Sequence, residues 1–135
     1  MELGVFESPG KEWDEFAFQY TDLIFYQSIW SEVLKKGLGG HPLYFYLREG
    51  EKIVAGLPGI LLNFKIFKIL YASIPYGHLI GERSYYPVFL ELLEKEFRKR
   101  GIDQVRLDPI LVHRSSLDAY QLAGNLFGCS YRLDI

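Results

Sequence analysis

The chain has 135 residues, of which 49% are hydrophobic and 24% are charged, and its formal net charge is −2. This length and composition predict one folded domain over residues 1–135 with a single substantial core. The nearly balanced charge excludes a nucleic-acid surface that depends on bulk electrostatic attraction, although local basic clusters could still bind phosphate. The lone Cys129 excludes an internal disulfide framework and a cysteine-based zinc site.

Membrane-spanning and exported proteins carry recognisable apolar segments. No stretch reaches the roughly 18 uninterrupted apolar residues that a transmembrane helix needs. The first four residues, Met-Glu-Leu-Gly, lack the basic region and the apolar segment of a signal peptide. We therefore expect a cytoplasmic protein without a transmembrane segment.

The N-terminal part predicts a strand and a short helix. Leu3–Phe6 is a short apolar run, typical of an edge strand. The spacing of Trp13, Phe16 and Tyr20 is helical, so these three aromatic residues indicate one buried helix face. Ser8 or Asp14 is expected to cap this helix, because both side chains can accept a hydrogen bond from a free backbone N–H.

A second helix is predicted after Ser28, which looks like its N-cap, and Gly37 is expected to end it. Lys35 and Lys36 fall in the last turn. Their positive charge suits the C-terminal end of a helix dipole, which is a structural explanation. The alternative is that the two lysines bind a phosphate-bearing ligand. Trp30, on the apolar stripe of this helix, fits a core anchor better than a ligand contact.

Three strands are expected to form an antiparallel meander. Leu43–Arg48 alternates and is rich in aromatic residues, Glu49–Lys52 reads as a hairpin turn, and Ile53–Leu62 follows with Pro58 at a bulge or edge. Lys68–Ile74 is the third strand.

The second turn of this meander is apolar. Phe64, Ile66 and Phe67 lie at or near it. If their side chains are exposed, they indicate an interface, and if they fold back they belong to the core.

The stretch Tyr71–Arg83 is a candidate ligand site, because a predicted strand ends there at a Pro-Tyr-Gly corner and a predicted helix follows. Free backbone N–H groups and a helix N-terminus favour an anionic ligand at such a corner. The candidate binding residues are Tyr76, Gly77, His78 and Arg83. His78 is also the candidate general base, as the only histidine of the loop. The competing interpretation is an ordinary exposed loop.

The C-terminal third continues with helix and strand signals. Tyr86–Arg100 has apolar residues at spacings of three and four and predicts an amphipathic helix closed by Gly101. A strand over Ile102–Leu107, a helix over Leu117–Phe127 and a final strand over Cys129–Ile135 follow. The expected order is β-α-α-β-β-β-α-β-α-β, an α/β protein with a mixed sheet flanked by helices.

Arg106 and Asp108 lie two residues apart on the predicted strand and therefore share a face. They can pair with each other. Alternatively, Arg106 faces a cleft and binds a diphosphate or a carboxylate, for which a guanidinium is well suited. The three histidines show no metal-ligand spacing, so no metal site is predicted.

Several short motifs together resemble the FemAB/FemX family of aminoacyltransferases, a branch of the GNAT acyltransferase fold. They are Phe25–Trp30, the strand-turn-strand around Glu49–Lys52, Ile74–Gly77 and Arg106–Pro109, in this order and at these separations. The resemblance covers almost the whole chain. It implies a GNAT-like fold and an activity that attaches an amino acid, delivered by aminoacyl-tRNA, to the stem peptide of a cell-wall precursor.

Proteins of that family contain two GNAT-like halves packed together. This chain has the length of one half, and its motifs match the first. That half contributes mainly to precursor binding, so the resemblance implies acceptor binding more directly than unaided catalysis. A second hypothesis is a non-enzymatic half that homodimerises or pairs with a separately encoded second half. A third is an ordinary acyl-CoA N-acetyltransferase.

The acyl-CoA hypothesis meets a departure from the family pattern. The stretch Ile74–Gly81 has two glycines four apart and no leading basic residue, and Glu82 would repel a pyrophosphate. No cofactor is evident from the sequence.

Overall fold

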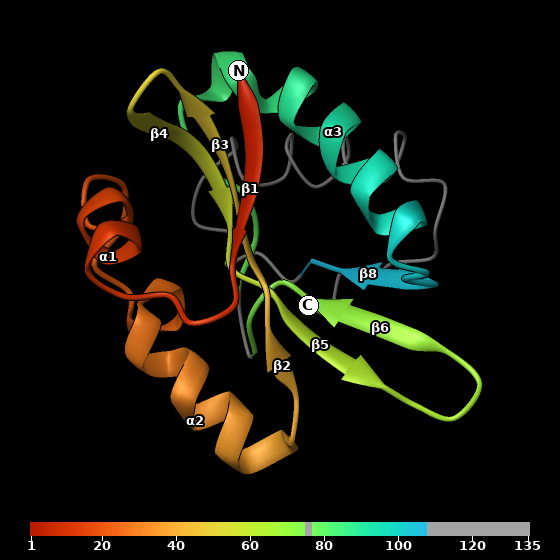
Figure 1. Ribbon diagram of the computed structural model, residues 1–135. Helices are drawn as coiled ribbons and strands as arrows, with labels where there is room; N and C mark the ends of the chain where they lie inside the picture. Colours follow the sequence, from red (N-terminus) through yellow and green to blue (C-terminus); the bar gives the residue numbers. More distant parts are fainter. Residues whose placement is uncertain (75–76, 108–135) are drawn as a thin grey trace.

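The computed structural model describes residues 1–74 and 77–107 (Figure 1). These residues form two four-stranded sheets and three α-helices, which confirms the predicted mixed class and is compatible with a GNAT-like fold. The predicted order is not reproduced in detail, because the described part contains more and shorter strands than expected. The helix predicted over Leu117–Phe127 and the strand after it lie outside the described residues.

The first sheet has the strand order β1-β3-β4-β7 and is antiparallel throughout. The edge strand predicted at the N-terminus is confirmed as β1, which pairs with β3 over its whole length. The predicted hairpin turn is also confirmed, since Glu49 pairs with Lys52 across it. The four strands are β1 (Glu2–Phe6), β3 (Tyr44–Glu49), β4 (Lys52–Leu57) and β7 (Ile80–Gly81).

The second sheet has the order β2-β5-β6-β8. Its strands are β2 (His41–Pro42), β5 (Ile60–Asn63), β6 (Lys68–Tyr71) and β8 (Gln104–Arg106). The β5–β6 pair is antiparallel, whereas β6 and β8 run parallel. Two neighbouring strands therefore end at the same edge of this sheet, next to each other.

The prediction of one continuous strand over Ile53–Leu62 was wrong, and with it the prediction of a single mixed sheet. The chain leaves the first sheet at Leu57 and enters the second at Ile60. Pro58 has no N–H to donate to a ladder, so it interrupts the pairing at this point. A Cβ on Gly59 would lie 2.5 Å from the carbonyl oxygen of Leu43, whose own N–H donates to the Gly59 carbonyl at 2.8 Å.

Three α-helices flank the sheets. They are α1 (Lys11–Ala17), α2 (Ser28–Leu38) and α3 (Tyr86–Lys99). Short 3₁₀ turns precede two of them, η1 (Ile24–Tyr26) before α2 and η2 (Arg83–Tyr85) before α3. The amphipathic third helix is confirmed. Figure 1 shows α1 and α2 on one flank of the first sheet and α3 on the other.

The end of α2 lies two residues later than predicted. Gly37 does not terminate the helix, which continues to Leu38. Gly39 is the residue that leaves it, with a φ of +69° and its N–H bonded to the Lys35 carbonyl. Glycine adopts this left-handed conformation at little cost, which is why it suits the position after a helix.

The described residues contain two apolar clusters. The larger one lies between α3 and the two sheets and includes fully buried Phe45, Phe89 and Leu70. The smaller one surrounds Trp13 and Phe16 of α1, which pack against Tyr44 of β3. The helix face predicted for the region of Trp13 is thus confirmed for its first two aromatic residues, while Tyr20 lies beyond the helix.

Asp14 is a helix cap, although for a different helix from the one predicted. Gly10 is the N-cap residue of α1, and in the described part of the chain no side chain caps this helix. The Asp14 carboxylate instead accepts the N–H of Ser28 at 2.7 Å and the Ser28 hydroxyl at 2.5 Å. It therefore serves the first turn of α2 from a neighbouring helix and holds the two helices together.

Replacing Asp14 with alanine is expected to lower the free energy of unfolding by about 1–2 kcal/mol, because an N–H of α2 loses its acceptor. Glu15→Ala is the control, since this exposed side chain makes only a 3.8 Å ion pair with Lys11. Urea denaturation followed by circular dichroism measures both. Equal midpoints for the two variants would rule out the capping role.

Candidate functional site

The parallel strands β6 and β8 end side by side, and the candidate site lies at this edge. Tyr71, the last residue of β6, pairs with Arg106, the last residue of β8. One residue further on, the N–H of Ala72 donates to the Arg106 carbonyl at 2.8 Å. Beyond this bond the chain leaves the sheet, and an edge of this kind is where open α/β sheets commonly hold ligands.

The segment that leaves the sheet is the 72–79 loop, which connects β6 of the second sheet to β7 of the first. Before the loop, Tyr71 pairs with Ile60 of β5, and after it Ile80 pairs with Gly56 of β4. Ser73 has a φ of +60°, a left-handed conformation that is uncommon for a residue with a Cβ. Gly77 packs so tightly that a Cβ would lie 1.7 Å from the Ala72 carbonyl oxygen.

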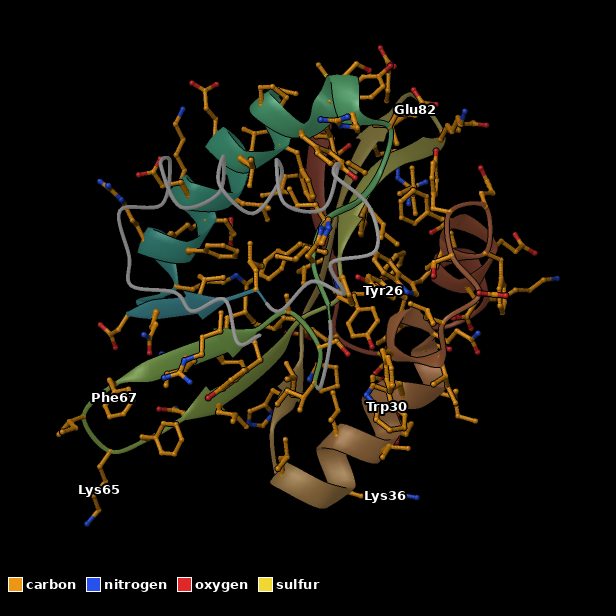
Figure 2. All side chains as sticks on the ribbon, turned by 180° about the vertical axis from the view of Figure 1, so that it is seen from behind. Tyr26, Trp30, Lys36, Lys65, Phe67 and Glu82 are labelled. Carbon is orange, nitrogen blue, oxygen red and sulfur yellow. The ribbon has the colours of Figure 1, made fainter. Side chains whose placement is uncertain are left out.

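Hydrogen bonds from η1 and α2 hold both arms of this loop. The Ser73 hydroxyl donates to the Phe25 carbonyl at 2.7 Å, and the Trp30 indole N–H donates to the Ile74 carbonyl at 2.6 Å. On the other arm, the N–H of His78 donates to the Tyr26 hydroxyl at 3.2 Å. Figure 2 shows Tyr26 and Trp30 close together beside the loop.

These contacts relate two of the short motifs to each other. Phe25–Trp30 and the residues around Ile74 lie far apart in the sequence, yet their side chains and backbone meet directly. Trp30 was predicted as a core anchor. Its ring packs on Phe25 with centroids 5.2 Å apart, while its N–H fixes the loop. The roles of Ser73 and Tyr26 were not predictable from the sequence, because they depend on hydrogen-bond partners that lie 48 and 52 residues away along the chain.

Arg106 is the positively charged group at the strand ends. Its guanidinium lies over the Tyr71 ring, 5.4 Å from the centroid, and its side chain is half-buried. The Nε atom is buried and has no hydrogen-bond partner within residues 1–74 and 77–107. A buried donor without an acceptor is costly, so this N–H is suited to a ligand oxygen. The pairing with Asp108 stays a prediction, because Asp108 lies outside the described residues.

His78, the predicted base, is buried at 7% exposure. Burial lowers the pKa of its imidazole from 6.5 to about 4, and the backbone of Leu79 only partly opposes this. The ring is therefore neutral at pH 7, and no residue that the structure describes forms a hydrogen bond with its Nδ1. Burial also raises the pKa of the neighbouring Tyr26 hydroxyl to about 12, so that group stays protonated.

The lowered pKa of His78 makes folding depend on pH. The unfolded chain binds a proton at this histidine below about pH 6.5, whereas the folded chain does so only near pH 4. The contribution of neutral His78 to the free energy of unfolding is complete above pH 6.5 and is lost as the pH falls toward 4. We expect the free energy of unfolding to fall by about 2–4 kcal/mol over this window.

Urea titrations at several pH values measure this dependence. His78→Gln should flatten the change between pH 6.5 and 4, since glutamine does not titrate. His41→Gln is the matched control, because His41 is exposed and its loss should leave the slope intact. A His78→Gln variant with the wild-type slope would contradict the assignment.

The other predicted site residues are dispersed. Lys35 and Lys36 are exposed in the last turn of α2. Arg83 lies in η2, where its charge is close enough to Tyr86 to oppose the rise in the pKa of that buried hydroxyl. Gly77 and His78 belong to the 72–79 loop, and Tyr76 lies outside the described residues.

Comparisons with known proteins do not assign the chain to a group. No family model and no curated protein matches the sequence. Within residues 1–74 and 77–107, no helix is long and apolar enough to cross a membrane. In the same ranges no group of three or more histidine, cysteine, aspartate or glutamate side chains could hold a metal ion.

Proposed function

We propose that the chain is a Fem-type aminoacyltransferase-like domain that binds a peptide-like or anionic acceptor of the cell-wall precursor type. The observation that carries the proposal is the buried Nε of Arg106 at the paired ends of β6 and β8, which has no hydrogen-bond partner among the described residues. A guanidinium donates to a carboxylate in a planar, charge-assisted geometry. The Tyr71 ring beneath it holds that plane in position.

The backbone contacts around Arg106 also support binding. The Arg106 carbonyl accepts the Ala72 N–H. The residues after Ala72 are held by the hydrogen bonds from Ser73 to Phe25 and from Trp30 to Ile74. A site held by such contacts loses little conformational freedom when a ligand arrives. In the proposed arrangement the acceptor lies across the strand ends, with its carboxylate on Arg106.

In this proposal the domain binds the acceptor and does not by itself catalyse aminoacyl transfer. Deprotonating an acceptor amine needs an accessible base, and the neutral His78 is buried with a lowered pKa. Aminoacyl-tRNA as donor and a second GNAT-like subunit as partner belong to the same proposal. A separate subunit would supply groups for the transfer step.

Coenzyme A is not part of the proposal. In a GNAT-like domain its pyrophosphate would need free N–H groups at the start of α3. Pro87 lies in the first turn of that helix and donates none, and Glu82, just before η2, carries a negative charge. Among the described residues, Glu82 forms an ion pair with the exposed Lys52, at 3.5 Å. These residues do not fit a pyrophosphate well.

Isothermal titration with a synthetic stem pentapeptide carrying a free C-terminal carboxylate tests the proposal. Arg106→Gln should weaken binding about 10- to 100-fold, which corresponds to the loss of charge-assisted hydrogen bonds. Arg98→Gln is the matched control, since that exposed arginine pairs with Glu94 on α3. The same peptide with an amidated C-terminus should bind as weakly to the wild type as the acid binds to Arg106→Gln. Equal affinities for all four combinations would refute the proposal.

A further inference from the structure

The tip of the β5–β6 hairpin exposes a cluster of large apolar side chains, which we call the hairpin tip (Phe64–Phe67). Ile66 is 89% exposed, and Phe64 and Phe67 are also exposed. The two phenyl rings stack with centroids 5.0 Å apart, and the Phe64 N–H donates to the Phe67 carbonyl at 2.8 Å. The apolar residues are therefore presented together on a closed, ordered turn.

Positive charge accompanies this apolar tip. Lys65 lies between the phenylalanines and is exposed, and Lys68 follows them at the start of β6. The sequence contains no aspartate or glutamate from Lys52 to Gly81. The carboxylate of Asp103 accepts the backbone N–H of Lys68 at 2.8 Å, at the base of the hairpin. The tip itself is apolar and basic.

Helix α2 also exposes apolar and basic side chains, but it lies apart from the hairpin tip. Figure 2 shows Lys65 at one side of the described structure and Lys36 at the other. Ile29 and Val33 of α2 are exposed one helical turn apart, and Lys36 follows on the same side together with the exposed Glu32. The apolar and basic character without an accompanying carboxylate therefore belongs to the hairpin tip.

We propose that the hairpin tip inserts into the interface of a lipid bilayer that carries anionic headgroups. Aromatic and aliphatic side chains flanked by lysines suit this region, where apolar groups enter the acyl boundary and cations meet the headgroups. A projecting tip fits a fluid surface, whereas a protein partner would need a matching hollow. Charge complementarity favours anionic lipid over a second copy of this chain, whose tip carries the same positive charge.

Co-sedimentation with vesicles measures the binding. We expect the full chain to bind vesicles of phosphatidylcholine and phosphatidylglycerol at 3:1, and to bind pure phosphatidylcholine vesicles much more weakly. Ile66→Asp should weaken binding to the anionic vesicles at least about tenfold, and Lys65→Gln about fivefold, the factor expected for one lysine near the surface. Both side chains are exposed, so the melting temperature should stay unchanged.

Matched variants on another surface provide the control. Phe18→Asp replaces an exposed aromatic residue next to α1, and Lys11→Gln removes an exposed lysine from the same helix. Both should leave vesicle binding at the wild-type level. If Phe18→Asp weakens binding as much as Ile66→Asp does, the hairpin tip is not the inserting element.

Sedimentation velocity separates the membrane proposal from self-association. The proposal predicts a sedimentation coefficient that does not change between wild type and Ile66→Asp. Absence of binding to anionic vesicles would overturn it, and so would a self-association that Ile66→Asp abolishes. Neither result would bear on peptide binding at Arg106, which is measured without lipid.

Discussion

Replacing Trp13 with alanine should lower the free energy of unfolding by about 3–5 kcal/mol, the largest effect expected of a single substitution here. Trp13 has no exposed surface and packs on Phe16 and Tyr44. Its indole N–H donates to the Tyr26 carbonyl at 2.6 Å. The ring also fills the space beside Gly56, where a Cβ would lie 2.7 Å from it.

Urea denaturation followed by circular dichroism measures this loss. Trp13→Phe separates the two contributions, because it keeps most of the packing and leaves the Tyr26 carbonyl without its donor, at a cost of about 1–3 kcal/mol. Phe18→Ala is the control, since that ring lies just past the end of α1 and is mostly exposed. A Trp13→Ala loss no larger than that of Phe18→Ala would contradict the assignment of this cluster as a second core.

Gly77→Ala should destabilise the protein by about 1–3 kcal/mol and displace the 72–79 loop. The added Cβ would lie 1.7 Å from the Ala72 carbonyl oxygen and 2.7 Å from the Ser73 Cβ. Because the nearest atom belongs to the backbone, no rotation of a side chain can relieve the clash. The loop must move, and with it the hydrogen bond from the His78 N–H to Tyr26.

Gly37→Ala is the opposite case and therefore the control. Gly37 lies within α2 with open space around it, so alanine there should stabilise the helix by about 0.5–1 kcal/mol. The midpoints of urea denaturation are expected to shift in opposite directions. In addition, Gly77→Ala should lower the affinity for the pentapeptide, whereas Gly37→Ala should not. Shifts in the same direction would show that the loop is less constrained than its contacts indicate.

Features set by neighbouring residues were predictable from the sequence. The hairpin turn after Glu49 and the amphipathic helix α3 depend on local turn chemistry and on apolar spacing, and both are confirmed. The interruption at Pro58 was also expected, because a proline cannot donate to a ladder. That the chain changes sheet at this proline was not expected. A β-bulge within one sheet and a change of sheet give the same sequence pattern, a proline inside an apolar run.

Features set by distant residues were not predictable in this way. Asp14 was assigned to its own helix, because nothing local indicates that its carboxylate reaches Ser28. His78 follows Gly77 in a loop rich in turn residues, so its burial was not expected. The apolar pair that follows, Leu79 and Ile80, was the one local signal for it. The partnering of Arg106 with Tyr71 required the register of two parallel strands.

The most direct test of the central proposal is residue-resolved. Titration of the isotopically labelled chain with the stem pentapeptide, followed by amide chemical shifts, should give saturable changes at Tyr71, Ser73 and Arg106. Arg106→Gln should abolish them at the same peptide concentrations. Saturable changes confined to another surface, or none at concentrations where the acidic peptide is in large excess, would contradict a binding site at the ends of β6 and β8.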